Sequence, residues 1–199
     1  MKKIVFTIAL GLGLLTANAQ IQSLAGPRLG LVYISASPGS VFLNGDIQLE
    51  DLGELPENYN DIDKGTFTSL YGWQWESRFA DGGNVTGIVE WIALVGGMEK
   101  GKFLPSVSSM VGARTASGFE FAVGPNLSLS LLSMVFGMGY NFKSGNLNIP
   151  VNIAFVPGRK ETYEKRSESN DEGKEVQVAP IDYHSGNRFS ITVGFNLNK

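Results

Sequence analysis

The sequence contains no cysteine and only one histidine, His184. The absence of cysteine excludes disulfides, thiolate metal sites and cysteine nucleophiles, and also the acylated N-terminal cysteine of a lipoprotein. A single histidine excludes metal sites that need several. We therefore expect neither a metal site nor a cofactor.

A strong net charge and a long apolar segment are also lacking. The formal charge is −3, and nothing in it indicates a nucleic-acid partner. The mean hydropathy is +0.01, so we expect no long membrane-spanning helix in the mature chain. Mean hydropathy does not reveal a membrane β-barrel, because half of its strand residues are polar. Glycine, at 25 of 199 residues, and aromatic residues, at 11%, are frequent, and both suit a barrel.

The first 19 residues have the pattern of a secretory signal peptide. Two lysines precede a short apolar run, and Ala17-Asn18-Ala19 forms a small-residue cleavage site. An uncleaved N-terminal anchor is the alternative, but the run is short for a membrane span. We predict that residues 1–19 are removed and that residues 20–199 form one β-barrel domain.

The segment Phe67–Phe79 alternates strictly between two kinds of side chain. In a β-strand, successive side chains point to opposite faces of the sheet. A membrane-barrel strand needs about 9–11 residues, with apolar and aromatic side chains toward lipid and polar ones toward the lumen. One face of this segment carries Phe67, Ser69, Tyr71, Trp73, Trp75, Ser77 and Phe79; the other carries Thr68, Leu70, Gly72, Gln74, Glu76 and Arg78.

Seven further segments alternate in a similar way. They cover residues 27–35, 85–96, 107–116, 119–129, 134–142, 147–155 and 188–198. The total of about eight is even, as single-chain bacterial barrels require. The sequence therefore predicts an all-β fold: a closed, antiparallel, up-and-down transmembrane β-barrel.

The lengths of the connections support this architecture. The second, fourth and sixth connections are short turns at 81–84, 117–118 and 144–146, whereas the first and seventh are long. Outer-membrane barrels have short periplasmic turns and longer external loops, so both termini are predicted to be periplasmic.

The two long connections are rich in charged residues. The first, residues 36–65, is acidic, and the seventh, residues 157–187, mixes both signs. We interpret both as solvated loops. Carboxylates in the first suit a divalent cation, but their spacing matches no calcium loop.

Pro125 and Pro150 interrupt two predicted strands. Proline cannot donate a ladder hydrogen bond, and a closed barrel has no free edge. We expect a bulge or an irregularity at each.

The chain resembles the small outer-membrane β-barrel family of Gram-negative bacteria. The resemblance covers most of the mature chain and rests on its alternating strands, its connection lengths and the segments GFEFAVGPNLSLS, GMGYNFKSGNLNIPVNIAF and ITVGFNLNK. It implies location in the cell outer membrane, contact with outer-membrane lipid and insertion by the barrel-assembly machinery. That machinery reads an apolar C-terminal strand; Phe195 and Leu197 match, but the terminal Asn198-Lys199 departs from the pattern. The family is functionally mixed, so the fold alone assigns no activity.

The inward face is predicted to hold a polar network. An eight-stranded barrel is just wide enough for side chains to fill its interior, and buried charges there must be paired. We interpret this set as an ion-pair plug; a narrow channel or a small-ligand site is the alternative. A wide pore needs about 16–18 strands. The set comprises Arg28, Gln74, Glu76, Arg78, Glu90, Arg114, Glu120 and Arg188.

The outward face is predicted to hold lipid-facing and interfacial aromatic residues. The alternative is a soluble periplasmic calyx for an apolar ligand, in which the aromatic residues would face inward. Alternation alone does not decide which face is inside. The set comprises Tyr71, Trp73, Trp75, Trp91, Phe119, Phe121 and Tyr140.

Catalysis has one candidate, the sequence Asp182-Tyr183-His184-Ser185. Some barrel-embedded lipid A deacylases use a histidine and a serine separated by one residue. Here the two are adjacent and would face opposite ways in a strand, so a triad is poorly arranged. We predict a non-enzymatic outer-membrane protein with a structural or surface-interaction role and an extracellular partner bound through its loops; a lipid-modifying hydrolase is the alternative.

Overall fold

A computed structural model describes residues 24–45, 64–129, 131–163, 168–169, 175–176 and 181–197. The predicted signal peptide and the acidic stretch of the first connection (residues 46–63) lie outside these residues. Among the described residues, no helix is both long and apolar enough to cross a bilayer.

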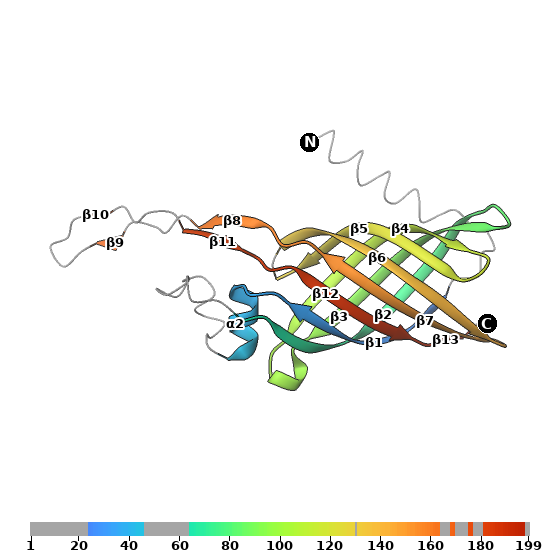
Figure 1. The fold of residues 1–199 in the computed structure, drawn as a ribbon, viewed down its shortest axis with the longest axis horizontal. Helices are drawn as coiled ribbons and strands as arrows, with labels where there is room; N and C mark the ends of the chain where they lie inside the picture. Colours follow the sequence, from blue (N-terminus) through green and yellow to red (C-terminus); the bar gives the residue numbers. More distant parts are fainter. Residues whose placement is uncertain are drawn as a thin grey trace, which may run out of the picture.

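Antiparallel strands close into an eight-stranded barrel (Figure 1). Seven strands follow one another in the sheet, and the eighth, interrupted once, pairs with both the first and the seventh and so closes the ring. The all-β, closed antiparallel barrel predicted from the sequence is thus confirmed. The strands are β1 (Ala25–Ile34), β2 (Thr66–Asp81), β3 (Val85–Gly96), β4 (Leu104–Thr115), β5 (Phe119–Ser128), β6 (Leu131–Ser144), β7 (Leu147–Val156), and β12 (Arg188–Gly194) with β13 (Asn196–Leu197).

The exposure of alternate residues in β2 shows which face is inside. Gln74 and Glu76 are 1% exposed, whereas Phe67 is 65% and Trp75 50% exposed. The aromatic face therefore forms the outer wall and the charged face lines the lumen.

The two ends of the barrel differ. The short turns at 82–84, 116–118 and 145–146 lie at the same end as the described ends of the chain, which we call the terminal end. Each turn contains a glycine with positive φ, which a side chain would strain: Gly83 (77°), Gly118 (100°) and Gly145 (59°). The three short turns and the long first and seventh connections are thus where the sequence predicted them. The opposite end, which we call the loop end, carries the two long connections and the η4 connection, but also a short one, because β5 ends at Ser128 and β6 begins at Leu131.

The prolines interrupt the ladders, as predicted. Pro125 remains in register with Met134 of β6, but the pairing of β4 with β5 skips from Asn126 to Val123. At Pro150, the pairing of β7 with the last strand skips from Val151 to Asn148, and the last strand is interrupted at Phe195, between β12 and β13. No register shift accompanies either gap, because a missing N–H removes ladder hydrogen bonds without requiring an extra residue. A bulge does occur in β2, between Arg78 and Ala80.

The first connection contains a helix that the sequence analysis missed: α2 (Pro38–Asn44). Ser37 and Ser40 form a reciprocal capping box, Pro38 occupies the first turn, and Gly45 ends the helix with φ 91°. Pro38 and Gly45 are therefore start and stop signals of a helix within a connection that was interpreted as a solvated loop. Phe42 and Leu43 of α2 are buried, which packs the helix onto the loop end of the barrel.

The seventh connection is also more ordered than predicted. It forms β8 (Lys160–Tyr163) paired with β11 (Ile181–His184), and β9 (Glu168–Ser169) paired with β10 (Glu175–Val176). The β8–β11 ribbon extends beyond the barrel at the loop end (Figure 1). Between β3 and β4, the 3-10 helix η4 (Met98–Lys100) replaces the start of the predicted connection, and β4 begins at Leu104 instead of Val107.

Candidate functional site

The lumen is the candidate site, and it has two parts. Toward the terminal end, charged side chains meet across the barrel; we call this part the ion-pair half. Toward the loop end, a cavity of about 390 Å³ lies between the strands and α2; we call this part the cavity half.

Arg114 is the centre of the ion-pair half. Its Nη1 donates to Glu76 Oε1 at 2.7 Å, its Nη2 donates to Glu76 Oε2, and its Nε donates to Glu120. The pair with Glu76 is therefore bidentate, the geometry that suits guanidinium and carboxylate groups. Arg78 approaches Glu76 from the other side, at 3.7 Å. All of these side chains except Arg78 are buried.

A second chain of contacts joins three more of the predicted residues. Arg28 Nε donates to Gln74 Oε1 at 2.6 Å, and Gln74 Nε2 donates to Glu90. The guanidinium of Arg28 lies over Gly194, where any Cβ would collide with it. Glycine at this position thus makes room for a buried arginine.

Seven of the eight predicted lumen residues meet in these contacts. Three arginines (28, 78 and 114) oppose three glutamates (76, 90 and 120), so their formal charges cancel. Buried charges are tolerated when they are paired and hydrogen-bonded. Glu76 and Glu120 meet arginines directly, whereas Arg28 and Glu90 are linked only through Gln74. Within the described residues, Arg28 Nη1 and Arg78 Nε have no hydrogen-bond partner.

Arg188, the eighth residue, lies apart. Its Nη1 donates to Ser128 Oγ at 2.8 Å and its Nη2 to Asn126 Oδ1 at 3.4 Å. Among the described residues it makes no ion pair, and its buried Nε has no hydrogen-bond partner. It extends from β12 to β5 across the cavity half instead of joining the ion-pair half.

The cavity half departs from the prediction of a polar interior. Many inward-facing positions near the loop end are aliphatic, although Ser108, Asn126 and Ser128 also line the cavity. The aliphatic side chains, together with Leu43 of α2, form two apolar clusters at the cavity. The first contains Val32, Ile34, Leu43 and Leu70, packed by Leu94 and Leu104; the second contains Met110, Ala122, Val135 and Val156, packed by Ile92 and Ala154. These side chains are too short to meet across the lumen, so this half is not plugged.

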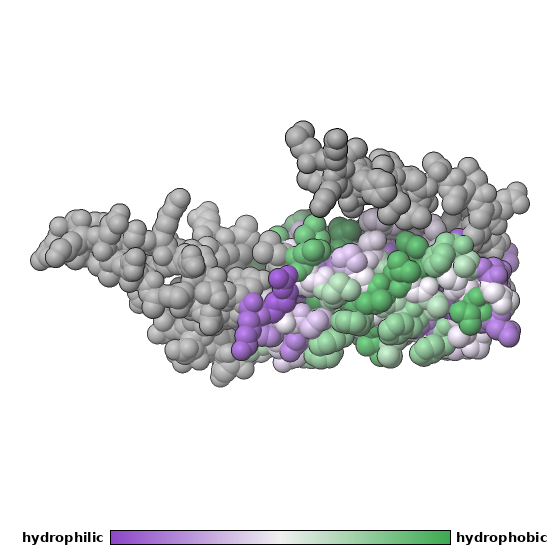
Figure 2. All heavy atoms as spheres, turned by 90° about the horizontal axis from the view of Figure 1, so that it is seen from above, coloured by the Kyte–Doolittle hydropathy of each residue, from purple (hydrophilic) through white to green (hydrophobic). Residues whose placement is uncertain are grey.

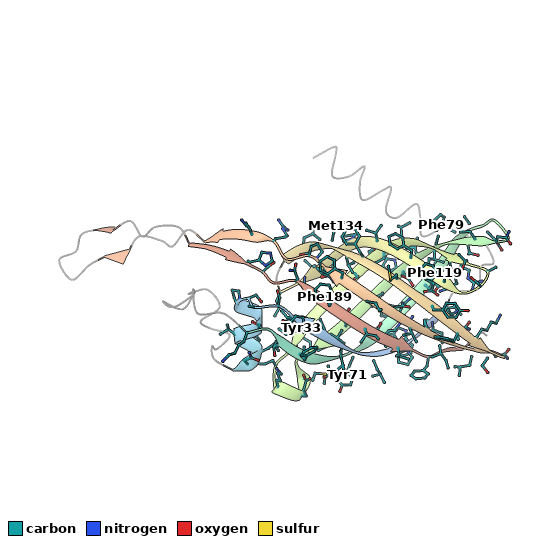
Figure 3. All side chains as sticks on the ribbon, viewed as in Figure 1. Tyr33, Tyr71, Phe79, Phe119, Met134 and Phe189 are labelled. Carbon is teal, nitrogen blue, oxygen red and sulfur yellow. The ribbon has the colours of Figure 1, made fainter. Side chains whose placement is uncertain are left out.

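The predicted aromatic residues all lie on the outer wall. Each is at least 40% exposed, and Trp75 stands directly opposite Trp91 in the register of β2 and β3. Figure 3 labels further outward side chains, among them Tyr33, Phe79 and Phe189. The set comprises Tyr71, Trp73, Trp75, Trp91, Phe119, Phe121 and Tyr140.

An aromatic row that the sequence analysis missed crosses five neighbouring strands. Its members stand opposite one another in successive registers, with ring centroids 4.6 Å apart for Phe155 and Phe189 and 4.9 Å for Tyr33 and Phe67. Alternation showed that each faces outward, but only the register aligns them. The row runs Phe136, Phe155, Phe189, Tyr33, Phe67.

The side chains of the catalytic candidate contact backbone N–H groups. The Nδ1 atom of His184 accepts from Gly186 N–H at 3.1 Å, and Ser185 Oγ accepts from Arg159 N–H at 2.9 Å. The side chain of Asp182 lies outside the described part.

Glu99 forms a separate anionic site at the loop end. Its carboxylate accepts from Thr68 Oγ1 at 2.5 Å, from Ser69 N–H at 3.1 Å and from the Ser69 hydroxyl. Glu99 is exposed. Slight desolvation acts to raise its pKa, but hydrogen bonds from Ser69 and Thr68 outweigh this effect and lower the pKa from 4.5 to about 2. This contact fixes η4 to β2. Within the described ranges, no cluster of histidine, aspartate and glutamate is suited to a metal ion.

The chain matches no known family model and no curated protein sequence. Its function therefore has to be argued from the barrel, its outer wall and its lumen.

Proposed function

We propose that the protein is an outer-membrane β-barrel of a Gram-negative cell envelope, with a structural or surface-interaction role. One observation carries the proposal: the outer wall is aromatic and aliphatic, whereas the charged side chains face the lumen. Figure 2 shows apolar residues gathered along the middle of the wall and hydrophilic residues toward both ends. This is the distribution that a bilayer requires.

Contact of this apolar outer wall with water would be unfavourable. Soluble monomers rarely expose continuous apolar patches larger than a few hundred Å². Here exposed apolar side chains occur on all eight strands, including Leu31, Val111 and Met138. The closed ladder also leaves no strand edge unpaired around the ring, and hydrocarbon does not tolerate an open edge. A soluble calyx would need the opposite orientation of the two faces.

The proposed orientation places the terminal end in the periplasm and the loop end outside the cell. The long connections, residues 36–66 and 157–187, then present α2 and the β8–β11 ribbon to an extracellular partner. The barrel-assembly machinery is the proposed partner during insertion, and lipid is the partner afterwards.

Cell fractionation with a mobility gel tests the proposal. We expect the protein in the outer-membrane fraction, and we expect the unboiled, detergent-extracted protein to migrate differently from the boiled one because the barrel stays folded. Recovery from the soluble periplasmic fraction without detergent, and without a mobility shift, would reject the membrane assignment.

A matched pair of substitutions tests lipid contact more locally. Val111→Arg places a charge midway along the outer wall, and Val85→Arg places the same charge at the terminal end. In a bilayer we expect a cost of about 2–4 kcal/mol at the middle and about 0–1 kcal/mol near the interface, measured by denaturant unfolding in lipid vesicles. Equal costs at the two positions would contradict a bilayer around the wall.

A deletion within the first connection tests whether the barrel inserts without this loop. Removing residues 46–61 should leave insertion and the mobility shift unchanged, because β1 and β2 pair from Ile34 and Thr66 without them. Gel mobility of the deletion variant checks this. Loss of insertion would show that the first connection is part of the folding unit and not a surface loop.

A further inference from the structure

The cavity half of the lumen combines an apolar wall with a cation, Arg188, that makes no ion pair among the described residues. Its volume of about 390 Å³ lies within the range of about 300–1,000 Å³ typical of small-molecule sites. Val32, Leu70, Met110 and Val135 line it on different strands, and Phe42 of α2 lines its loop end. Burial of apolar surface favours an apolar occupant here.

Arg188 supplies the polar contact. Its hydrogen bonds go to neutral groups, the Ser128 hydroxyl and the Asn126 amide, and its Nε has no hydrogen-bond partner among the described residues. Arg188 is partly buried. A guanidinium withdrawn from water without a carboxylate partner is costly, and an anionic ligand would relieve that cost. Guanidinium groups bind carboxylates and phosphates through paired N–H donors.

The floor of the cavity has the opposite character. Glu90 and Glu120 line it, but Glu90 accepts from Gln74 and Glu120 accepts from Arg114. These carboxylates repel an anion. A ligand with one anionic end is therefore oriented with that end at Arg188.

We propose that the cavity binds a single-chain anionic amphiphile, with its headgroup at Arg188 and its alkyl chain between the two apolar clusters. Carboxylate and phosphate headgroups share the required chemistry. The inference goes beyond the proposed function, and it depends on the lumen alone, so it can fail while the membrane assignment holds.

Calorimetric titration of the purified full-length barrel in an amphipathic polymer tests the proposal. Four probes share a twelve-carbon chain: dodecanoate, dodecyl phosphate, dodecanol and dodecyltrimethylammonium. We expect the two anions to bind about 10- to 100-fold more tightly than the alcohol and the cation, from a charge-assisted hydrogen bond. Comparison of the two anions identifies the headgroup. Equal binding of all four probes, or binding of none, would overturn the proposal.

Three variants locate the site. Arg188→Gln should weaken anion binding about 10- to 100-fold and leave dodecanol binding unchanged. Arg159→Gln is the control, because this arginine lies outside the cavity at the same end and bonds to the Leu132 carbonyl. Val135→Phe should reduce binding of both dodecanoate and dodecanol, because the ring occupies the volume of the chain.

The gel mobility shift first verifies that each variant is folded, and the four-probe comparison on the unmodified protein does not depend on any variant. Unchanged dodecanoate affinity in folded Arg188→Gln would place the headgroup elsewhere and reject the assignment. Unchanged affinity in folded Val135→Phe would show that the chain lies outside the lumen.

Discussion

The two halves of the lumen obey the same alternation but reach different outcomes. In the ion-pair half, long side chains such as Arg114 and Glu76 reach across the barrel and meet. In the cavity half, Val32 and Val135 occupy equivalent inward positions and are too short to do so. Alternation therefore decides which side chains share the inner face. The length and the partners of those side chains decide whether the interior is filled.

The largest expected effect comes from removing the centre of the ion-pair half. Arg114→Leu leaves Glu76 and Glu120 as buried carboxylates that have lost their shared cation, which should cost about 3–5 kcal/mol in the free energy of unfolding. Arg188→Leu is the matched control, because it leaves no carboxylate without a partner. Denaturant unfolding in lipid vesicles measures both.

Equal destabilisation by these two variants would contradict the division of the lumen. A larger loss for Arg188→Leu would assign a structural role to that arginine and would weaken the case for its role in ligand binding.

Two isoleucines on the same strand provide a second comparison. Ile88 is fully buried, while Ile92, four residues further along the same face of β3, lines the cavity. Ile88→Ala should cost about 2–5 kcal/mol because it opens a new void. Ile92→Ala should cost less, since the side chain already borders empty volume. Unfolding free energies compare the two, and a larger cost for Ile92→Ala would mean that the cavity half is as tightly packed as the other.

The smallest effect concerns pH at the loop end. Because its hydrogen bonds lower the pKa of Glu99 from 4.5 to about 2, the carboxylate contributes stability above pH 4.5 and loses that contribution as the pH falls toward about 2. The difference in unfolding free energy between the unmodified protein and Glu99→Gln should therefore shrink across that window. The partners of Glu99 are hydroxyl and N–H groups, so salt should alter the difference little. A difference that instead grows below pH 4.5 would contradict the assigned pKa.

Much of the barrel could be predicted from the sequence. The strong alternation around Trp73 and the order of short and long connections led to the number of strands, to the inward position of Glu76 and to the outward position of Trp75. These features are local, so a single chain reveals them. The ladder interruptions at Pro125 and Pro150 could also be predicted, because proline has no N–H group to donate.

What could not be predicted depends on contacts across the barrel. Arg188 and Arg114 lie in different halves of the lumen because of which strands face each other across the barrel. Alternation along one strand contains no information on that arrangement. The cavity was missed for a related reason, because Val135 and Leu70 were weighed as strand residues and not by whether they meet. The helix α2 was missed because its connection was interpreted as a solvated loop from its charged residues, although Ser37 and Ser40 supplied a capping signal.

The most direct test of the account measures where the tryptophans lie. All three, Trp73, Trp75 and Trp91, are on the outer wall. In vesicles of phospholipid with brominated acyl chains, we predict strong quenching of the tryptophan fluorescence relative to unbrominated vesicles, because the bromine atoms would contact the indole rings. Fluorescence that is equally bright in both kinds of vesicle would place the tryptophans away from lipid and contradict the membrane-facing wall.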